Sequence, residues 1–119
     1  MKKVIPFLAL TLAVAASLVP LATGAPAATQ TVRVNATSYK ISLSAKPKAD
    51  TVRFVVRNVG DDEHDVWIRG GGRSAHTPVL APGRSATITM RLKRGVVYRF
   101  WCGVDDHASK GMLGSFRAR

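Results

Sequence analysis

The sequence has few of the residues that stabilise or define many small exported proteins. Cys102 is the single cysteine among 119 residues, so an intrachain disulfide is impossible and the bridged immunoglobulin domain is excluded. The paired Cys-x2-Cys and His-x3-His elements typical of structural zinc sites do not occur either. No stretch of useful length has the periodicity of an amphipathic helix. What remains is a chain of short alternating segments with one thiol.

Acidic residues are also scarce. Seven Asp and Glu stand against 18 Lys and Arg, which gives a formal net charge of +11. A basic balance of this size is compatible with nucleic acid, an anionic membrane or an acidic protein as partner. The basic residues are scattered singly along the chain rather than clustered, so nucleic-acid binding is not predicted.

The amino-terminal segment has the layout of a secretory signal. Lys2 and Lys3 precede an apolar run over residues 4–21, and small residues follow it. This pattern predicts a signal peptide over residues 1–27 and a mature domain over residues 28–119. The protein is therefore expected outside the cytoplasm, in the periplasm or the extracellular space.

Retention of this segment as a membrane anchor is the competing interpretation, because its length approaches that of a spanning helix. Pro6 and Pro20 interrupt the run, and no basic stop-transfer cluster follows it. The sequence therefore favours removal of the signal peptide, and the mature domain is not expected to insert stably into a membrane.

The rest of the chain predicts an all-β domain. Turn residues separate short segments rich in β-branched and aromatic residues, and their number fits a two-sheet sandwich of seven to eight strands. Val52, Phe54 and Val56 are expected in its core, packed against Val97 and Trp101 or against the alternate residues of that strand. The expected strands are residues 31–36, 39–44, 51–58, 65–69, 85–92, 96–102 and 113–118.

The loop after the penultimate predicted strand concentrates metal-binding side chains. Cys102, His107 and Met112 follow one another with the spacing C-x4-H-x4-M, so one loop can turn all three inward. His64, in an earlier loop, supplies a second imidazole. Two imidazoles and a thiolate with a weak axial thioether form the ligand set of blue copper.

Zinc is the main alternative metal, because His and Cys both bind it. Structural zinc sites take four strong donors, and methionine is a poor one. A bond to copper also explains how a lone thiol in an exported protein is protected from oxidation. The sequence therefore favours one copper ion.

Three stretches of the sequence resemble the plastocyanin/azurin family of cupredoxins. They are Asn58-Val59-Gly60 leading to His64-Asp65, then residues 77–83, and then residues 98–114 with Cys102, His107 and Met112. The resemblance covers nearly all of residues 31–119, and its last stretch is the most specific.

The resemblance implies a Greek-key β-sandwich of eight strands with copper at one end. His64, Cys102 and His107 would be the equatorial ligands and Met112 the axial ligand. The implied function is one-electron transfer, with His107 as the usual port for electrons and Trp101, which precedes the cysteine, as a second route.

The sequence departs from the family pattern in two places. Asp105-Asp106 stands where many relatives have Pro-Gly before the second histidine, so the loop shape is expected to differ. Asp65 follows the first histidine where Asn is also common, so the hydrogen bond that steadies the cysteine loop is expected to change.

The sequence thus predicts a mobile, monomeric type 1 copper protein that carries single electrons between redox proteins and docks with them transiently. It is not expected to be an enzyme, because a second copper centre would need further histidines and only His76 is left over. The alternative is a copper carrier or buffer that delivers the ion itself.

Six of the seven acidic residues fall in the two loops that hold the predicted ligands, and the seventh is Asp50. We hypothesise that these carboxylates favour Cu(II) and lower the reduction potential. The six are Asp61, Asp62, Glu63, Asp65, Asp105 and Asp106.

Overall fold

The structure is a computed structural model that describes residues 2–4, 6, 13–17 and 28–119. The predicted signal peptide and its cleavage site lie largely outside these residues. Within the described part of the chain, no helix has both the length and the apolar character needed to cross a membrane.

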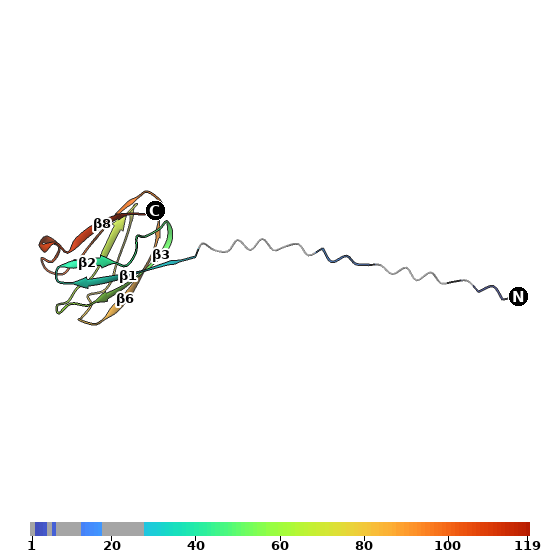
Figure 1. The fold of residues 1–119 in the computed structure, drawn as a ribbon, viewed down its shortest axis with the longest axis horizontal. Helices are drawn as coiled ribbons and strands as arrows, with labels where there is room; N and C mark the ends of the chain where they lie inside the picture. Colours follow the sequence, from blue (N-terminus) through green and yellow to red (C-terminus); the bar gives the residue numbers. More distant parts are fainter. Residues whose placement is uncertain (1, 5, 7–12, 18–27) are drawn as a thin grey trace.

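Residues 28–119 form two packed sheets of four strands each (Figure 1). The first has the order β2-β1-β3-β6, with β2 (Lys40–Leu43), β1 (Gln30–Thr37), β3 (Asp50–Asn58) and β6 (Ser85–Leu92). The second has the order β5-β4-β7-β8, with β5 (Arg73–His76), β4 (Trp67–Gly70), β7 (Val97–Trp101) and β8 (Leu113–Arg117). The predicted all-β sandwich is confirmed.

Two elements differ from the sequence prediction. Strand β5 is absent from the predicted set, because its four residues are mostly polar and show no apolar alternation. It forms because Gly71 and Gly72 adopt φ values of 57° and 74°, which reverse the chain and pair β5 with β4. A 3₁₀ turn, η1 (Ala108–Lys110), also interrupts the loop between β7 and β8.

The core lies between the sheets and follows the two-residue period of the strands. Val52, Phe54 and Val56 of β3 are fully buried, as predicted. On β7 the alternate residues point inward: Tyr98 and Phe100 are buried, whereas Val97 is 46% exposed and Trp101 is half-buried on the outer face.

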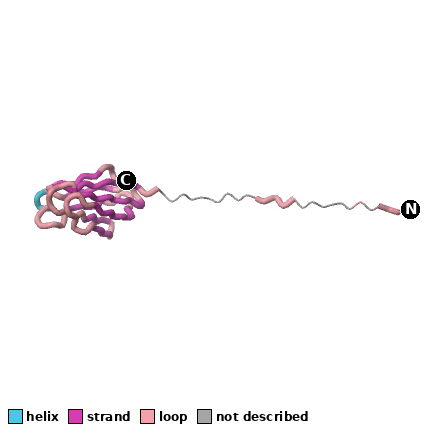
Figure 2. Tube along the Cα trace, turned by 90° about the horizontal axis from the view of Figure 1, so that it is seen from below, coloured by secondary structure: helices cyan, strands magenta, loops and turns pink. Residues whose placement is uncertain are grey.

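Strand direction brings several loops to one end of the sandwich. Strands β1 and β3 are parallel neighbours, so the loops that follow Thr37 and Asn58 leave the sheet at the same end. The β7–β8 connection with η1 lies at this end too, opposite the carboxyl terminus (Figures 1 and 2). This end is called the metal end below.

Candidate metal centre

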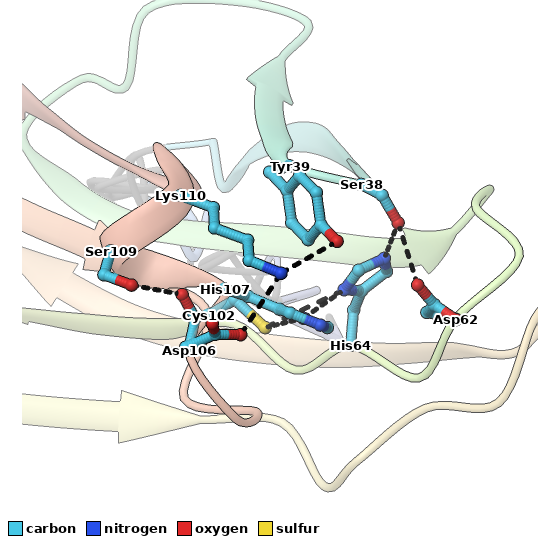
Figure 3. Close-up of polar contacts among 9 residues, drawn as sticks. All are labelled: Ser38, Tyr39, Asp62, His64, Cys102, Asp106, His107, Ser109 and Lys110. Carbon is cyan, nitrogen blue, oxygen red and sulfur yellow. Dashed lines mark hydrogen bonds and ion pairs between the residues drawn. The ribbon is translucent and has the colours of Figure 1, made fainter.

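Three of the four predicted ligands converge at the metal end. His64, Cys102 and His107 are buried, and one donor atom from each lies within 4.8 Å of the other two. The sulfur of Cys102 is 3.9 Å from Nδ1 of His64 and 3.7 Å from Nδ1 of His107. Figure 3 shows both rings beside this sulfur.

The spacing of these atoms fits a bound transition-metal ion. Metal bonds of about 2.0 Å to nitrogen and about 2.3 Å to sulfur, spread in a trigonal plane, would place nitrogen and sulfur about 3.7 Å apart. The two nitrogens face each other at 3.2 Å. Their lone pairs repel at this distance unless a proton or a cation lies between them, so the cluster is built to take a positive charge.

The donor set matches type 1 copper better than zinc. Among the described residues, no carboxylate and no further His or Cys joins the cluster, so four strong zinc donors are not available. Met112, the predicted axial ligand, is fully buried and belongs to the same core cluster as Cys102. Two imidazoles, a thiolate and a thioether are the blue-copper set.

His64 is held by its backbone and by Asn58. Its N–H and C=O both pair with Leu80, at 3.1 and 2.7 Å. The buried amide of Asn58 donates to the carbonyls of Asp62 and Leu80 and accepts from the N–H of Gly60. One side chain therefore fixes both flanks of the loop that presents His64.

The far nitrogen of His64 faces Ser38. Nε2 lies 3.4 Å from Oγ of Ser38, which in turn lies 3.4 Å from a carboxylate oxygen of Asp62 (Figure 3). A partner on Nε2 directs the Nδ1 lone pair toward the cluster and orients the ring. Ser38 belongs to the β1–β2 turn, and no local sequence signal marks it as part of the site.

Backbone hydrogen bonds close the loop that carries the other three residues. The N–H of Cys102 donates to the carbonyl of Met112, and the N–H of Met112 donates to the carbonyl of His107. Gly111 ends η1 with a φ of 104°, a value that favours glycine. The ring of Tyr39 packs edge-on against His107, with centroids 5.2 Å apart.

Asp65 ties the two ligand loops together. One carboxylate oxygen accepts the N–H of Gly103, next to Cys102, at 2.5 Å, and the other accepts the indole N–H of Trp67 at 3.0 Å. A hydrogen bond to the cysteine loop is therefore present with Asp at this position, and the second carboxylate oxygen accepts from a tryptophan.

Burial changes the proton affinities of two ligands. Loss of hydration, followed by the proximity of His107, lowers the pKa of His64 below its ordinary value of 6.5. Loss of hydration raises the pKa of Cys102 above its ordinary value of 9.0. In the metal-free protein both groups thus favour their neutral forms.

The surface over the site is acidic. Asp62, Glu63 and Asp105 line a pocket of about 280 Å³ together with Val104 and His107. Asp106 is different, because its carboxylate lies 3.5 Å from the ammonium of Lys110. Of the two residues that depart from the family pattern, Asp105 thus lies beside His107, the predicted electron port, and Asp106 forms an ion pair with Lys110.

The other two histidines singled out from the sequence, His76 and His107, lie in different surroundings. His76 does not join the cluster; it is exposed, and its ring stacks on Trp67 with centroids 4.0 Å apart. His107 is buried at 6% exposure but borders the acidic pocket. Asn58 stood in the motif noted from the sequence, but its clamping role required the structure.

Comparison with solved structures finds the same fold. A dithionite-reduced auracyanin from the photosynthetic bacterium Roseiflexus castenholzii matches with a TM-score of 0.63 at 21% identity, covering 77% of this chain and 98% of that one. Auracyanin B matches with a TM-score of 0.64 at 20% identity, covering 76% and 88%. A multicopper oxidase matches with a TM-score of 0.55 at 19% identity, covering 75% of this chain but 41% of the oxidase.

No protein-family model matches the sequence, and the comparison with curated proteins found no match. The structural matches establish the fold, and the chain's own residues establish the site. The eight-stranded sandwich has a cupredoxin-like fold, and the buried His64, Cys102, His107 and Met112 at its metal end provide the donor set of a type 1 copper site. The sequence resemblance is confirmed at this level.

Replacing Asn58 by Ala should destabilise the protein and loosen the His64 loop. Three backbone groups lose a hydrogen bond to the Asn58 amide, and two of these groups are buried or half-buried, so we expect a loss of about 2 to 4 kcal/mol in the free energy of unfolding. Urea unfolding of the metal-free protein measures it. The matched Asn35→Ala change on the exposed face of β1 should cost less than about 0.5 kcal/mol. Equal losses of stability in the two variants would show that the hydrogen bonds of Asn58 do not restrain the His64 loop.

The stability of the metal-free protein should depend on pH at both ends. The lowered pKa of His64 means that stability present above pH 6.5 is lost as pH falls from 6.5 through the folded-state value. The raised pKa of Cys102 means that stability present below pH 9.0 is lost as pH rises through its folded-state value. Thermal unfolding across pH measures both, and Cys102→Ala should remove the alkaline loss alone.

Proposed function

We propose that the protein is a one-electron carrier that works outside the cytoplasm. The observation that carries this proposal is the preformed cluster of His64, Cys102 and His107, whose donor atoms are buried and already spaced for a metal ion. Copper held there would supply the exchange of one electron between Cu(I) and Cu(II). The protein's own contribution is to keep the donors in place in both states.

Rigidity of the ligands is what a carrier needs. Thiolate and thioether suit Cu(I), while imidazole also suits Cu(II), and a fixed arrangement keeps the rearrangement between them small. The clamp at Asn58, the carboxylate of Asp65 and the hydrogen bonds of the 102–112 loop all restrain ligand motion. Burial of His64 and Cys102 keeps water from the donor atoms.

The same observations disfavour copper delivery as the main role. An ion inside this cluster would have to leave past buried ligands whose loops are cross-linked by hydrogen bonds. Delivery proteins need ligands that an acceptor can reach, whereas His64 is 0% exposed and Cys102 is 1% exposed. Rapid transfer of copper to a metal-free acceptor, with slow electron exchange, would reverse this choice.

The proposal includes how the protein meets its partners. An electron carrier of this size is expected to act as a monomer, in the periplasm or the extracellular space, and to dock weakly and briefly with redox proteins. The auracyanin matches are consistent with a small protein of one domain, because they cover 98% and 88% of the auracyanin chains. The multicopper oxidase is matched over less than half of its length, and catalysis is not proposed.

Adding Cu(II) to the metal-free protein should produce an intense visible band from charge transfer between thiolate and copper. Cys102→Ser should abolish the band, because an oxygen donor replaces the sulfur. Met112→Leu should keep the band and change the reduction potential, because only the weak axial donor is lost. Visible and EPR spectra with redox titration measure these effects; a colourless copper complex of the unaltered protein would exclude the type 1 assignment.

Removing the charge of Asp105 should raise the reduction potential. A carboxylate about 10 Å from copper favours Cu(II), and after salt screening its loss is worth on the order of 10 to 50 mV. Asn retains the left-handed backbone that Asp105 adopts, with φ 44°. Redox titration of Asp105→Asn measures the shift.

Two further variants control this experiment. Asp50→Asn removes an equal charge at another left-handed position, φ 76°, at the far end of β3, and should leave the potential unchanged. Asp106→Asn should have a smaller effect than Asp105→Asn, since Lys110 already offsets that carboxylate. A potential that falls or stays constant in Asp105→Asn would remove the electrostatic hypothesis.

A further inference from the structure

The outer face of the second sheet carries a row of rings. The cross-strand register places His76 opposite Trp67, and Trp67 opposite Trp101. The His76 and Trp67 rings are 4.0 Å apart at 13°, and the two indoles are 6.0 Å apart at 15°. Leu113, 58% exposed, extends the row on β8.

The next row on the same face is cationic. Arg69 and Arg99 are exposed and stand directly opposite each other on β4 and β7. Like charges in this position destabilise a sheet. The four strands contain Arg but no Asp or Glu, and among the described residues neither arginine makes a salt bridge. An anionic partner that binds beside the two guanidinium groups would reduce this repulsion.

A surface pocket joins the two rows. Arg69, Gly70, Val97, Arg99 and Trp101 line a pocket of about 480 Å³. It combines two guanidinium groups with the side of an indole, a combination enriched at the centres of protein interfaces. We call His76, Trp67, Trp101, Arg69 and Arg99 the ring-arginine face.

This face is connected to the metal centre by a short path. Trp101 is the residue before Cys102, so one peptide bond separates the row of rings from the thiol. Trp67 is connected as well, because its indole N–H and the N–H of Gly103 share the carboxylate of Asp65. A partner on this face would therefore sit close to the sulfur without covering the metal end.

We propose that the ring-arginine face docks an acidic redox protein and that electrons cross to it through Trp101. This inference rests on the proposed carrier function. It extends the route expected at Trp101 by naming the surface around it and the charge of the partner. The acidic pocket beside His107 repels such a partner, so charge directs an acidic protein to the sheet face and leaves the metal end to neutral or basic partners.

The first test needs no copper. Trp67 and Trp101 are the two tryptophans of the chain, so indole fluorescence reports on this face alone. An oligoglutamate peptide titrated into the metal-free protein at low salt should change the emission in a saturable way, and an oligolysine peptide should not. Arg69→Gln/Arg99→Gln should weaken the apparent affinity by about tenfold or more. The charge-matched Arg53→Gln/Arg91→Gln variant, on exposed positions of β3 and β6, should change it less than about twofold.

The second test measures electron exchange in the copper-loaded protein. One electron passes from the reduced protein to hexacyanoferrate(III), an anion, or to tris(1,10-phenanthroline)cobalt(III), a cation, and stopped-flow absorbance follows the oxidised copper band. Arg69→Gln/Arg99→Gln and Trp101→Leu should each slow the reaction with the anion by about threefold or more at low salt, beyond what the measured change in potential accounts for and with the band unchanged. The reaction with the cation should stay within about twofold.

Several outcomes would overturn the proposal, and they separate it from the carrier function. Equal effects of the two arginine pairs would show that overall charge, not this face, attracts anions. An unchanged rate with the anion in Trp101→Leu would place the exit elsewhere, while exchange itself would still support a carrier. Absence of exchange with both reagents would overturn carrier and route together, even if the peptide binds. Binding to phosphatidylglycerol vesicles that depends on Arg69 and Arg99, without an effect of oligoglutamate on the emission, would instead identify a membrane-facing surface.

Discussion

The approach of two imidazole nitrogens to 3.2 Å, with a thiol sulfur less than 4 Å from each, is the constraint on which the structure of the metal end depends. Without a proton or a cation between them this arrangement is unfavourable, and burial removes the water that could relieve it. The rest of the fold must therefore hold these atoms in place. Cation binding converts this local cost into stabilisation, since the ligands need not be gathered first.

Restraint comes from segments that are far apart in the sequence. Parallel pairing of β1 with β3 brings Ser38 beside His64, and the amide of Asn58 joins the 58–64 loop to Leu80. Asp65 joins Gly103, which follows β7, to Trp67, the first residue of β4, within the second sheet. Each link uses a different strand connection, so the site is complete only when both sheets have closed.

The sequence was sufficient for the features that depend on local pattern. Alternation located seven strands, and the spacing of Cys102 and His107 with one earlier histidine predicted the three donors that the structure brings together. It could not locate β5, whose pairing depends on a glycine turn rather than on apolar alternation. It also could not show Ser38 at His64 or the stacking of Trp67 between His76 and Trp101, because these contacts arise only when distant strands meet.

Both termini of the folded domain lie at the end of the sandwich opposite the metal end. Gln30, where β1 begins, exchanges hydrogen bonds with Lys46 and Lys48, and Arg119 pairs with Pro47 and Ala49, so both ends of the folded domain emerge together, away from η1 (Figure 1). Anything attached to either end of the folded domain, whether a neighbouring domain, a surface or an affinity tag, would lie at the end of the sandwich opposite the metal end. The metal end and the outer face of the second sheet would then stay exposed, as the proposed electron transfer requires.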